Sequence, residues 1–184
     1  CRAGASWAWT TRIDGKNVKA CIGKVAQMEG KSIITIEGLT EREKEVYVYA
    51  FAECGAVQCG FCIPGMIISA KALLDTTLEP TRADVQKALL GNICRCTGYV
   101  KIEDAILLAA RMFKENVPVP KNDADGTVGS RLHRVDAMEK ALGTGLYVDD
   151  MVVDGMIYAK AVRSKYPRAL VDAIHIEEAL AHPQ

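Results

Sequence analysis

Four of the seven cysteines in this 184-residue sequence stand in two tight pairs. Cys59 and Cys62 form a C-x2-C pair, and Cys94 and Cys96 form a C-x-C pair. Thiolates are the soft ligands that zinc and iron–sulfur clusters select, and two close pairs can converge on one centre. A buried core thiol is the ordinary interpretation of an isolated cysteine. For two close pairs joined by a helical segment, we expect a metal or cluster site.

The residues around the pairs suit a negatively charged centre. Gly55, Gly60 and Gly98 would let backbone N–H groups approach it, and Arg95 supplies a positive charge. Structural zinc is the alternative, although zinc sites more often use two C-x2-4-C pairs than a C-x-C pair. Cys54 lies outside the pairs, and we interpret it as a core thiol on a helix face.

Composition excludes several other classes of protein. The sequence holds 23 Lys and Arg against 23 Asp and Glu and is 49% hydrophobic, so overall disorder and a basic nucleic-acid surface are not expected. No apolar run is long enough to span a membrane. An odd number of clustered cysteines favours a reducing compartment, and we expect a cytoplasmic protein. The three histidines are scattered and not at ligand spacing; they are His133, His175 and His182.

The first 39 residues are typical of β-structure. Short β-branched runs at residues 10–13 and 18–21 flank Asp14-Gly15, a strong hairpin signal because glycine accepts a positive φ. A third run covers residues 33–36. Three short strands are a thin basis for an independent core, so this segment resembles the back half of a larger domain.

Residues 40–115 predict a bundle of four helices with short connections. A capping box at Thr40 opens the first helix, and a second capping box at Thr81 opens the third. Pro64 stands where a proline in the first turn of a helix is tolerated. The last helix is expected at about residues 102–113, from apolar residues at helical spacing.

The remaining sequence divides at a linker. Residues 116–130 are rich in Pro, Gly and charged residues and show no periodicity. In the part that follows, residues 131–184, two runs at 155–162 and 169–176 are typical of strands. Residues 177–181 are typical of the start of a helix.

Two motifs carry a family resemblance. Residues 53–65 (ECGAVQCGFCIPG) and 91–99 (GNICRCTGY) closely resemble the second [2Fe–2S] motif of the molybdenum hydroxylases, the xanthine dehydrogenase and aldehyde oxidoreductase family. The resemblance implies an α+β fold in three parts. Residues 1–39 look like the end of a plant-type ferredoxin domain of the β-grasp type, and residues 40–115 like the helical [2Fe–2S] domain. Residues 131–184 look like the opening of the molybdopterin-binding subunit, with the leading strands of an α/β hammerhead-like domain.

The resemblance also implies a function and partners. In the family, single electrons leave a molybdopterin centre through [2Fe–2S] clusters, and Cys59, Cys62, Cys94 and Cys96 match the ligands of one cluster. Gln58 matches a residue that hydrogen-bonds the pterin, and the ligand that matches Cys96 lies close to it. The expected partners are the adjoining molybdopterin-binding portion and an electron acceptor, either a flavin or an external protein. No catalytic residue is expected in this sequence, because the family's substrate site lies beyond Gln184.

The sequence departs from the family at the first cluster. The plant-type motif needs C-x4-C-x2-C and a later fourth cysteine. Cys1 and Cys21 match the first and fourth positions, but Ser6 and Trp9 stand at the second and third. An indole offers only an N–H donor and cannot replace a thiolate, so we expect the first cluster to be absent or defective. The departure leaves open a degenerate, non-redox copy that serves as an interaction scaffold.

Overall fold

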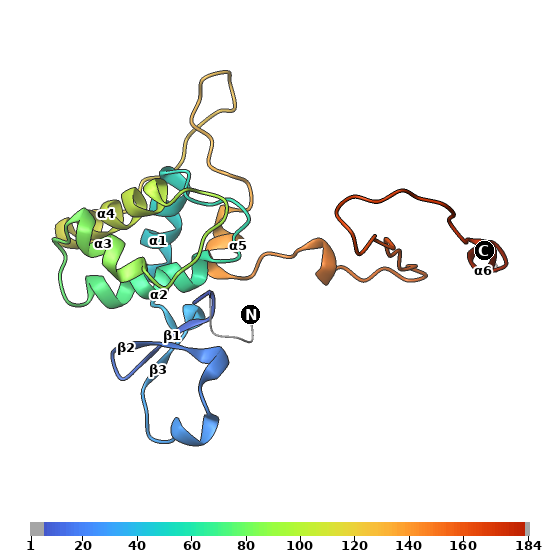
Figure 1. Cartoon of the computed structure of the whole chain (residues 1–184). Helices are drawn as coiled ribbons and strands as arrows, with labels where there is room; N and C mark the ends of the chain where they lie inside the picture. The colour runs from blue at the N-terminus through green and yellow to red at the C-terminus, as the bar shows by residue number, and fades with distance from the viewer. Residues whose placement is uncertain (1–5, 183–184) are drawn as a thin grey trace. The chain divides into compact units, whose positions relative to one another are not determined.

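The computed structural model describes residues 6–182 of the chain. The chain forms two compact units, the first ending at Leu146 and the second beginning at Tyr147. The first unit contains a small antiparallel sheet and the helices α1 to α5 (Figure 1). This mixed α and β architecture agrees with the α+β class that the sequence predicts.

The sheet has three strands in the order β2-β1-β3, all antiparallel. Strands β1 (Thr10–Ile13) and β2 (Lys16–Lys19) pair from Thr10↔Lys19 to Ile13↔Lys16, and β3 is only Ile33–Ile34. Asp14 and Gly15 have φ of 47° and 79°, which confirms the predicted hairpin turn.

The second strand lies two residues earlier than predicted, and the third strand is shorter than predicted. The expected strand at residues 18–21 instead ends at Lys19, where the 3₁₀ helix η1 (Ala20–Ile22) begins. Two further 3₁₀ helices, η2 (Val25–Gln27) and η3 (Ile36–Gly38), flank β3. A strand needs a hydrogen-bonded neighbour, and β1 is the partner that both β2 and β3 share.

All four predicted helices are present: α1 (Glu41–Glu53), α2 (Ile63–Leu74), α3 (Arg82–Leu89) and α4 (Val100–Glu115). Both predicted capping boxes form. The hydroxyl of Thr40 accepts from the N–H of Glu43 while the Glu43 carboxylate accepts from the N–H of Thr40, and Thr81 and Asp84 do the same. Pro64 lies in the first turn of α2, where its missing N–H costs no helical hydrogen bond.

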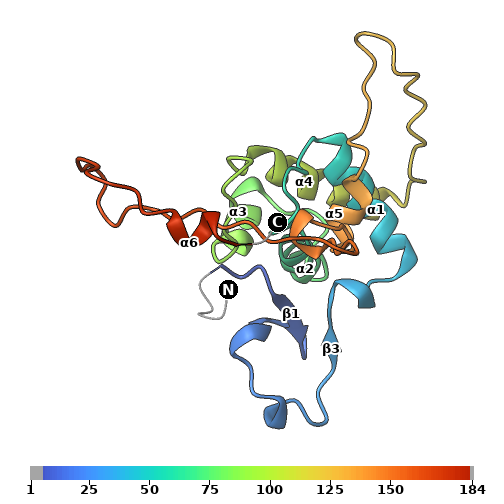
Figure 2. The ribbon, with the colours of Figure 1, turned by 90° about the vertical axis from the view of Figure 1, so that its right-hand side faces the viewer.

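The core lies among α1, α2 and α4 and is closed by α5 (Ala137–Leu142), a helix that the sequence analysis did not predict. Ala137 and Ala141 are buried. Helix α5 lies against α1 and α2 (Figures 1 and 2). A short helix that buries two alanines gives almost no periodic apolar signal, which explains why its sequence did not reveal it. Between α4 and α5, residues 117–135 form a long excursion without regular secondary structure.

The sheet packs on α2, and Trp7, just before the sheet, closely approaches Gly65 in α2 and Gly91 after α3 (Figure 2). A Cβ at Gly65 would lie 2.6 Å from the carbonyl oxygen of Trp7, and a Cβ at Gly91 would overlap the Trp7 indole. Asn92 is buried at this seam. Its side chain accepts a hydrogen bond from the Ser69 hydroxyl at 2.8 Å and donates to the carbonyl of Trp7 at 3.1 Å.

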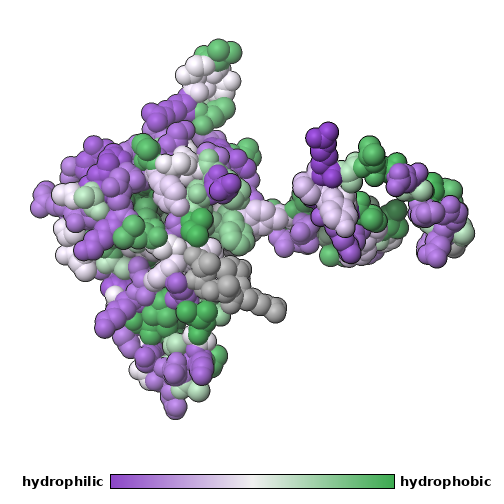
Figure 3. All heavy atoms as spheres, in the orientation of Figure 1, coloured by the Kyte–Doolittle hydropathy of each residue, from purple (hydrophilic) through white to green (hydrophobic). Residues whose placement is uncertain are grey.

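The second unit contains the 3₁₀ helix η4 (Val148–Asp150) and the helix α6 (Glu177–Leu180). Helix α6 begins where the sequence predicted a helix. The strands predicted at residues 155–162 and 169–176 are wrong for this structure: both segments lack regular secondary structure and are exposed. No strand lies beside them among the described residues, and an unpaired segment cannot form a sheet. Figure 3 shows the apolar side chains that this unit leaves on its surface. No helix in the described part of the chain has the length and apolar character needed to cross a membrane.

Candidate metal centre

Two loops of the first unit carry the paired cysteines. Cys59 and Cys62 lie in the loop from α1 to α2, and Cys62 is the N-cap residue of α2. Cys94 and Cys96 lie in the loop from α3 to α4. The fold brings the two loops together, because Cys62 lies beside Cys94 and Cys96 lies beside Cys59. The structure thus juxtaposes all four sulfurs singled out from the sequence.

The four thiols differ in burial and in acidity. Burial and the neighbouring Cys94 raise the pKa of Cys62, which is 5% exposed, to about 12. The hydrogen bond with Cys59 raises the pKa of the exposed Cys96. For Cys94, burial opposes ionisation, but hydrogen bonds to its sulfur outweigh burial and lower the pKa. Thiols this close share protons with one another, and a bound metal cation would take the place of those protons.

The sulfur of Cys94 sits inside a tight turn. The hydroxyl oxygen of Thr97 lies 3.1 Å from the sulfur, and the backbone nitrogens of Cys96 and Thr97 each lie 3.4 Å from it. The phenol of Tyr99 closes the loop, since it accepts from the N–H of Cys94 at 2.9 Å and donates to the carbonyl of Asn92 at 3.0 Å. Tyr99 has a φ of 73°, an unusual conformation for a tyrosine that this pair of hydrogen bonds holds in place.

The donor set is of the kind that a [2Fe–2S] cluster uses. Such a cluster takes four cysteine sulfurs, and four lie here as two neighbouring pairs. Two backbone N–H groups and the Thr97 hydroxyl surround the sulfur of Cys94. None of the six cysteines that the structure describes is in a disulfide. Within residues 6–182, no three or more Cys, His, Asp or Glu side chains surround a single point as a one-metal site requires.

The outer side of the site is exposed. Cys59 and Cys96 both face solvent, as does Gln58, whose amide has no hydrogen-bond partner among the described residues. Each loop also exposes one large apolar side chain beside its cysteines, Phe61 (57% exposed) and Ile93 (54% exposed). One edge of the thiol group is therefore accessible, while Cys62 closes the other edge within the core.

Four residues were matched to the ligand positions of a first cluster: Cys1, Ser6, Trp9 and Cys21. Cys1 lies outside the described residues. Cys21 is exposed on η1, and Trp9 is 59% exposed. Ser6 contributes its backbone carbonyl, which accepts from the N–H of Ile93 at 3.2 Å and so links this segment to the Cys94 loop. The expectation of an absent or defective first cluster stays a prediction.

Lys140 was not found by sequence reasoning, although it contacts the site. It lies on α5 and is only 8% exposed, with its aliphatic stem against Gly60. A Cβ built on Gly60 would lie 2.5 Å from the Cδ of Lys140. The glycine between the two cysteines signals a close approach, but the identity of its neighbour, far along the chain, depends on the tertiary structure.

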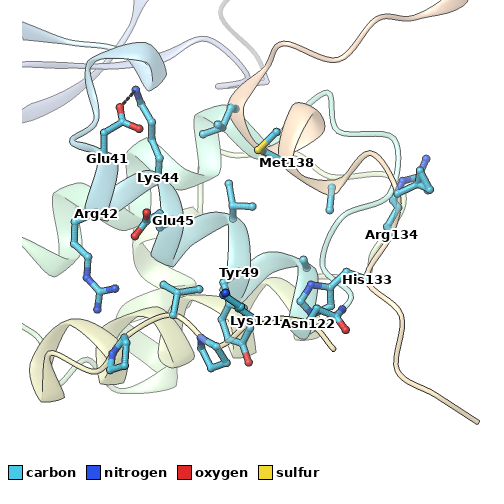
Figure 4. A pocket seen from close by; sticks show the side chains of 18 residues that line it. Glu41, Arg42, Lys44, Glu45, Tyr49, Lys121, Asn122, His133, Arg134 and Met138 are labelled. Carbon is cyan, nitrogen blue, oxygen red and sulfur yellow. Dashed lines mark hydrogen bonds and ion pairs between the residues drawn. The ribbon is translucent and has the colours of Figure 1, made fainter. Parts of the chain in front are cut away.

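A groove of about 720 Å³ lies elsewhere on this unit, between α1, residues 118–122 and residues 133–142 (Figure 4). Its rim is charged, and Lys44 pairs with Glu41 at 2.8 Å. At one end, His133 lies 2.8 Å from the Glu53 carboxylate. No cysteine lines the groove, so it is distinct from the thiol site.

Comparison with known proteins identifies a family domain in the middle of the chain. The family described as "[2Fe-2S] binding domain" matches residues 35–107, which include all four paired cysteines. The nicotinate dehydrogenase small FeS subunit of Eubacterium barkeri is 44% identical over 110 residues, covering 59% of this chain and 70% of that subunit.

Similarity also extends to larger proteins. The aldehyde oxidoreductase of Megalodesulfovibrio gigas is 37% identical over 195 residues, an alignment that covers 100% of this chain and 22% of that protein. The solved structure of the aldehyde oxidoreductase from Desulfovibrio gigas superposes with a TM-score of 0.73 at 40% identity, over 82% of this chain and 18% of that one. The quinoline 2-oxidoreductase structure from Pseudomonas putida 86 superposes with a TM-score of 0.58 at 38% identity, over 62% of this chain and 73% of that one. The chain thus spans about a fifth of the length of the aldehyde oxidoreductase that it matches.

Proposed function

Because the chain belongs to the molybdenum hydroxylase family, we propose that it is the iron–sulfur, electron-transfer segment of such an oxidoreductase. Relatives of which the chain covers about 70% are small FeS subunits, and a longer relative is an aldehyde oxidoreductase. The proposal rests on one observation above the others: two cysteine pairs, distant in sequence, are in direct contact at one place in the fold.

Cys59, Cys62, Cys94 and Cys96 are the proposed ligands of one [2Fe–2S] cluster. When bound, such a cluster accepts and releases one electron at a time. The chain's own residues would hold the donor set in place and shield part of it. Cys62 fixes one sulfur at the buried start of α2, and the Tyr99 phenol holds the Cys94 loop in its turn.

The exposed edge of the site is the proposed contact with a molybdopterin-binding partner. Cys96 places a sulfur at the surface, and the amide of Gln58 is exposed with no hydrogen-bond partner in the described chain. An amide offers two N–H donors and one acceptor, which suits the mixed donors and acceptors of a pterin ring. Electrons would enter across this edge and leave toward a flavin or an external acceptor.

The domain organisation follows from the same proposal. Residues 1–39 would be the end of a ferredoxin-like β-grasp domain, and residues 40–115 the cluster domain. Residues 116–130 would be a linker, and residues 131–184 the beginning of the molybdopterin-binding portion. The apolar side chains that the second unit leaves exposed support a further packing partner for residues 147–182. Helix α5, by contrast, packs within the first unit.

Metal analysis with a visible and an EPR spectrum of the anaerobically prepared chain tests the function. We expect about two irons per chain, red-brown colour and a paramagnetic signal after one-electron reduction. Colourless, zinc-loaded protein would show a structural zinc module instead, and folded, metal-free protein would show a non-redox scaffold. About four irons per chain would refute the interpretation of Ser6 and Trp9.

A further inference from the structure

Thr97 directs its hydroxyl group at a sulfur of the proposed centre. Its Oγ1 lies 3.1 Å from the Sγ of Cys94, within the same turn that brings the N–H groups of Cys96 and Thr97 to 3.4 Å. The family resemblance assigns a role to the cysteines and to Gln58, but none to this hydroxyl.

The local geometry sets the direction of the hydrogen bond. The N–H of Tyr99 donates to Thr97 Oγ1 at 3.2 Å, so the oxygen already serves as an acceptor on one side. A cysteine sulfur that binds a metal has lost its proton and can only accept. The hydroxyl proton of Thr97 therefore points to Cys94 whenever the site is loaded. Thr97 is half-buried and β-branched, which restricts the rotation that would carry its hydroxyl away.

We propose that Thr97 is a positioning residue that raises the reduction potential of the cluster through its hydrogen bond to Cys94. This inference rests on the proposed function. One-electron reduction adds one negative charge to the site, and a donor on a ligand sulfur stabilises the reduced form more than the oxidised form. The step moves one electron, supplied by the molybdenum centre in the proposed function or by a reduced mediator in vitro. It forms or breaks no bond of Thr97.

A redox titration followed by EPR tests the role of this hydroxyl, with the full chain and its Thr97→Val and Thr97→Ser variants. Valine keeps the shape of threonine but cannot donate, so at a fixed potential the ratio of reduced to oxidised cluster falls about tenfold, a shift of about 59 mV for one electron. Serine keeps the hydroxyl, so Thr97→Ser retains the wild-type potential. Equal potentials in wild type and Thr97→Val would overturn the proposal.

Two controls separate tuning from loosening of the loop. Tyr99→Phe removes the phenol that braces Cys94 but leaves the Thr97 hydroxyl, so its potential changes less than that of Thr97→Val. An equal shift in both variants would overturn the tuning role. If Thr97→Val does not load iron, Thr97→Ala takes its place. If Thr97→Ser loads iron but neither Thr97→Val nor Thr97→Ala does, the hydroxyl is needed for the structure of the site, and the proposal is also overturned. A wild-type chain without a reducible cluster would instead refute the proposed function.

Discussion

Gly60→Ala is expected to destabilise the protein and weaken cluster loading, because the space for a side chain at Gly60 is already filled. Gly60 lies between Cys59 and Cys62 with a φ of 86°, and the stem of Lys140 covers it. A new Cβ would lie 2.5 Å from Cδ and 2.8 Å from Cβ of that lysine. The Cβ of Lys140 is bonded to the backbone of α5, so it cannot swing away as the outer part of the side chain can.

The expected magnitude has two parts. A left-handed backbone conformation costs a non-glycine residue about 1–2 kcal/mol. Forcing an extra methyl group into a packed site costs about 1–3 kcal/mol more. Gly60→Ala therefore lowers the free energy of unfolding by about 2–5 kcal/mol. Gly98→Ala is the matched control, since Gly98 has a φ of 70° near the other cysteine pair but no atom within 4 Å of a new Cβ. It should lose only the backbone part, about 1–2 kcal/mol.

Urea denaturation of the anaerobic protein, followed by far-UV circular dichroism, measures both losses, and iron content measures loading. A double-mutant cycle with Lys140→Ala isolates the contact. Removing the stem beyond Cβ leaves the 2.8 Å contact but relieves the others, so the cycle should show a coupling energy of about 1 kcal/mol. Equal losses for Gly60→Ala and Gly98→Ala, or additive effects with Lys140→Ala, would refute the reasoning.

Three further changes have defined outcomes. Cys94→Ala should abolish the visible absorption of the cluster and lower the Tm, because metal binding and folding are coupled; unchanged colour and melting would exclude Cys94 as a ligand. Asn92→Ala should lower the free energy of unfolding by about 2–4 kcal/mol in urea, since the buried Ser69 hydroxyl and a backbone carbonyl lose their partner. Burial opposes ionisation of Glu43, but its hydrogen bonds with Lys71 and with Thr40, the N-cap residue of α1, hold its pKa below the usual range. The contribution of Glu43 to stability is therefore complete above the ordinary carboxyl pKa of about 4.3 and is lost as the pH falls through the lower pKa of the folded state. Urea midpoints measured across this pH range should show the loss in the wild type. The loss should be absent in Glu43→Gln.

Local signals in the sequence predicted the elements well wherever neighbouring residues alone determine the conformation. The hairpin at Asp14-Gly15 depends on positive φ at the turn, and the capping boxes at Thr40 and Thr81 depend on residues three apart. Both kinds of signal were confirmed. Segments whose structure needs a distant partner were predicted poorly. The apolar runs at 155–162 and 169–176 have strand-like sequences, but the described chain provides no neighbouring strand for them.

The candidate site shows the same division. Cysteine spacing was enough to select the two pairs, since each pair is local and thiolates have few alternative uses in close pairs. The hydrogen bond of Thr97 to Cys94 was missed because it depends on the exact path of the turn. The contact of Lys140 with Gly60 was missed because it forms only when α5, far from Gly60 in the sequence, packs against α1 and α2.

The seam between the sheet and α2 has a consequence for the spacing of the two cysteine-bearing regions. Because Gly65 and Gly91 have no side chain, the carbonyl and the indole of Trp7 can occupy the space where their Cβ atoms would lie. A methyl group at either position would push the N-terminal segment outward, and with it the carbonyl of Ser6 that accepts from Ile93 beside the Cys94 loop. The absence of a side chain at Gly65 and Gly91 therefore allows the N-terminal segment to lie close to the turn that carries Cys94. A larger residue at either position would lengthen the distance between the two.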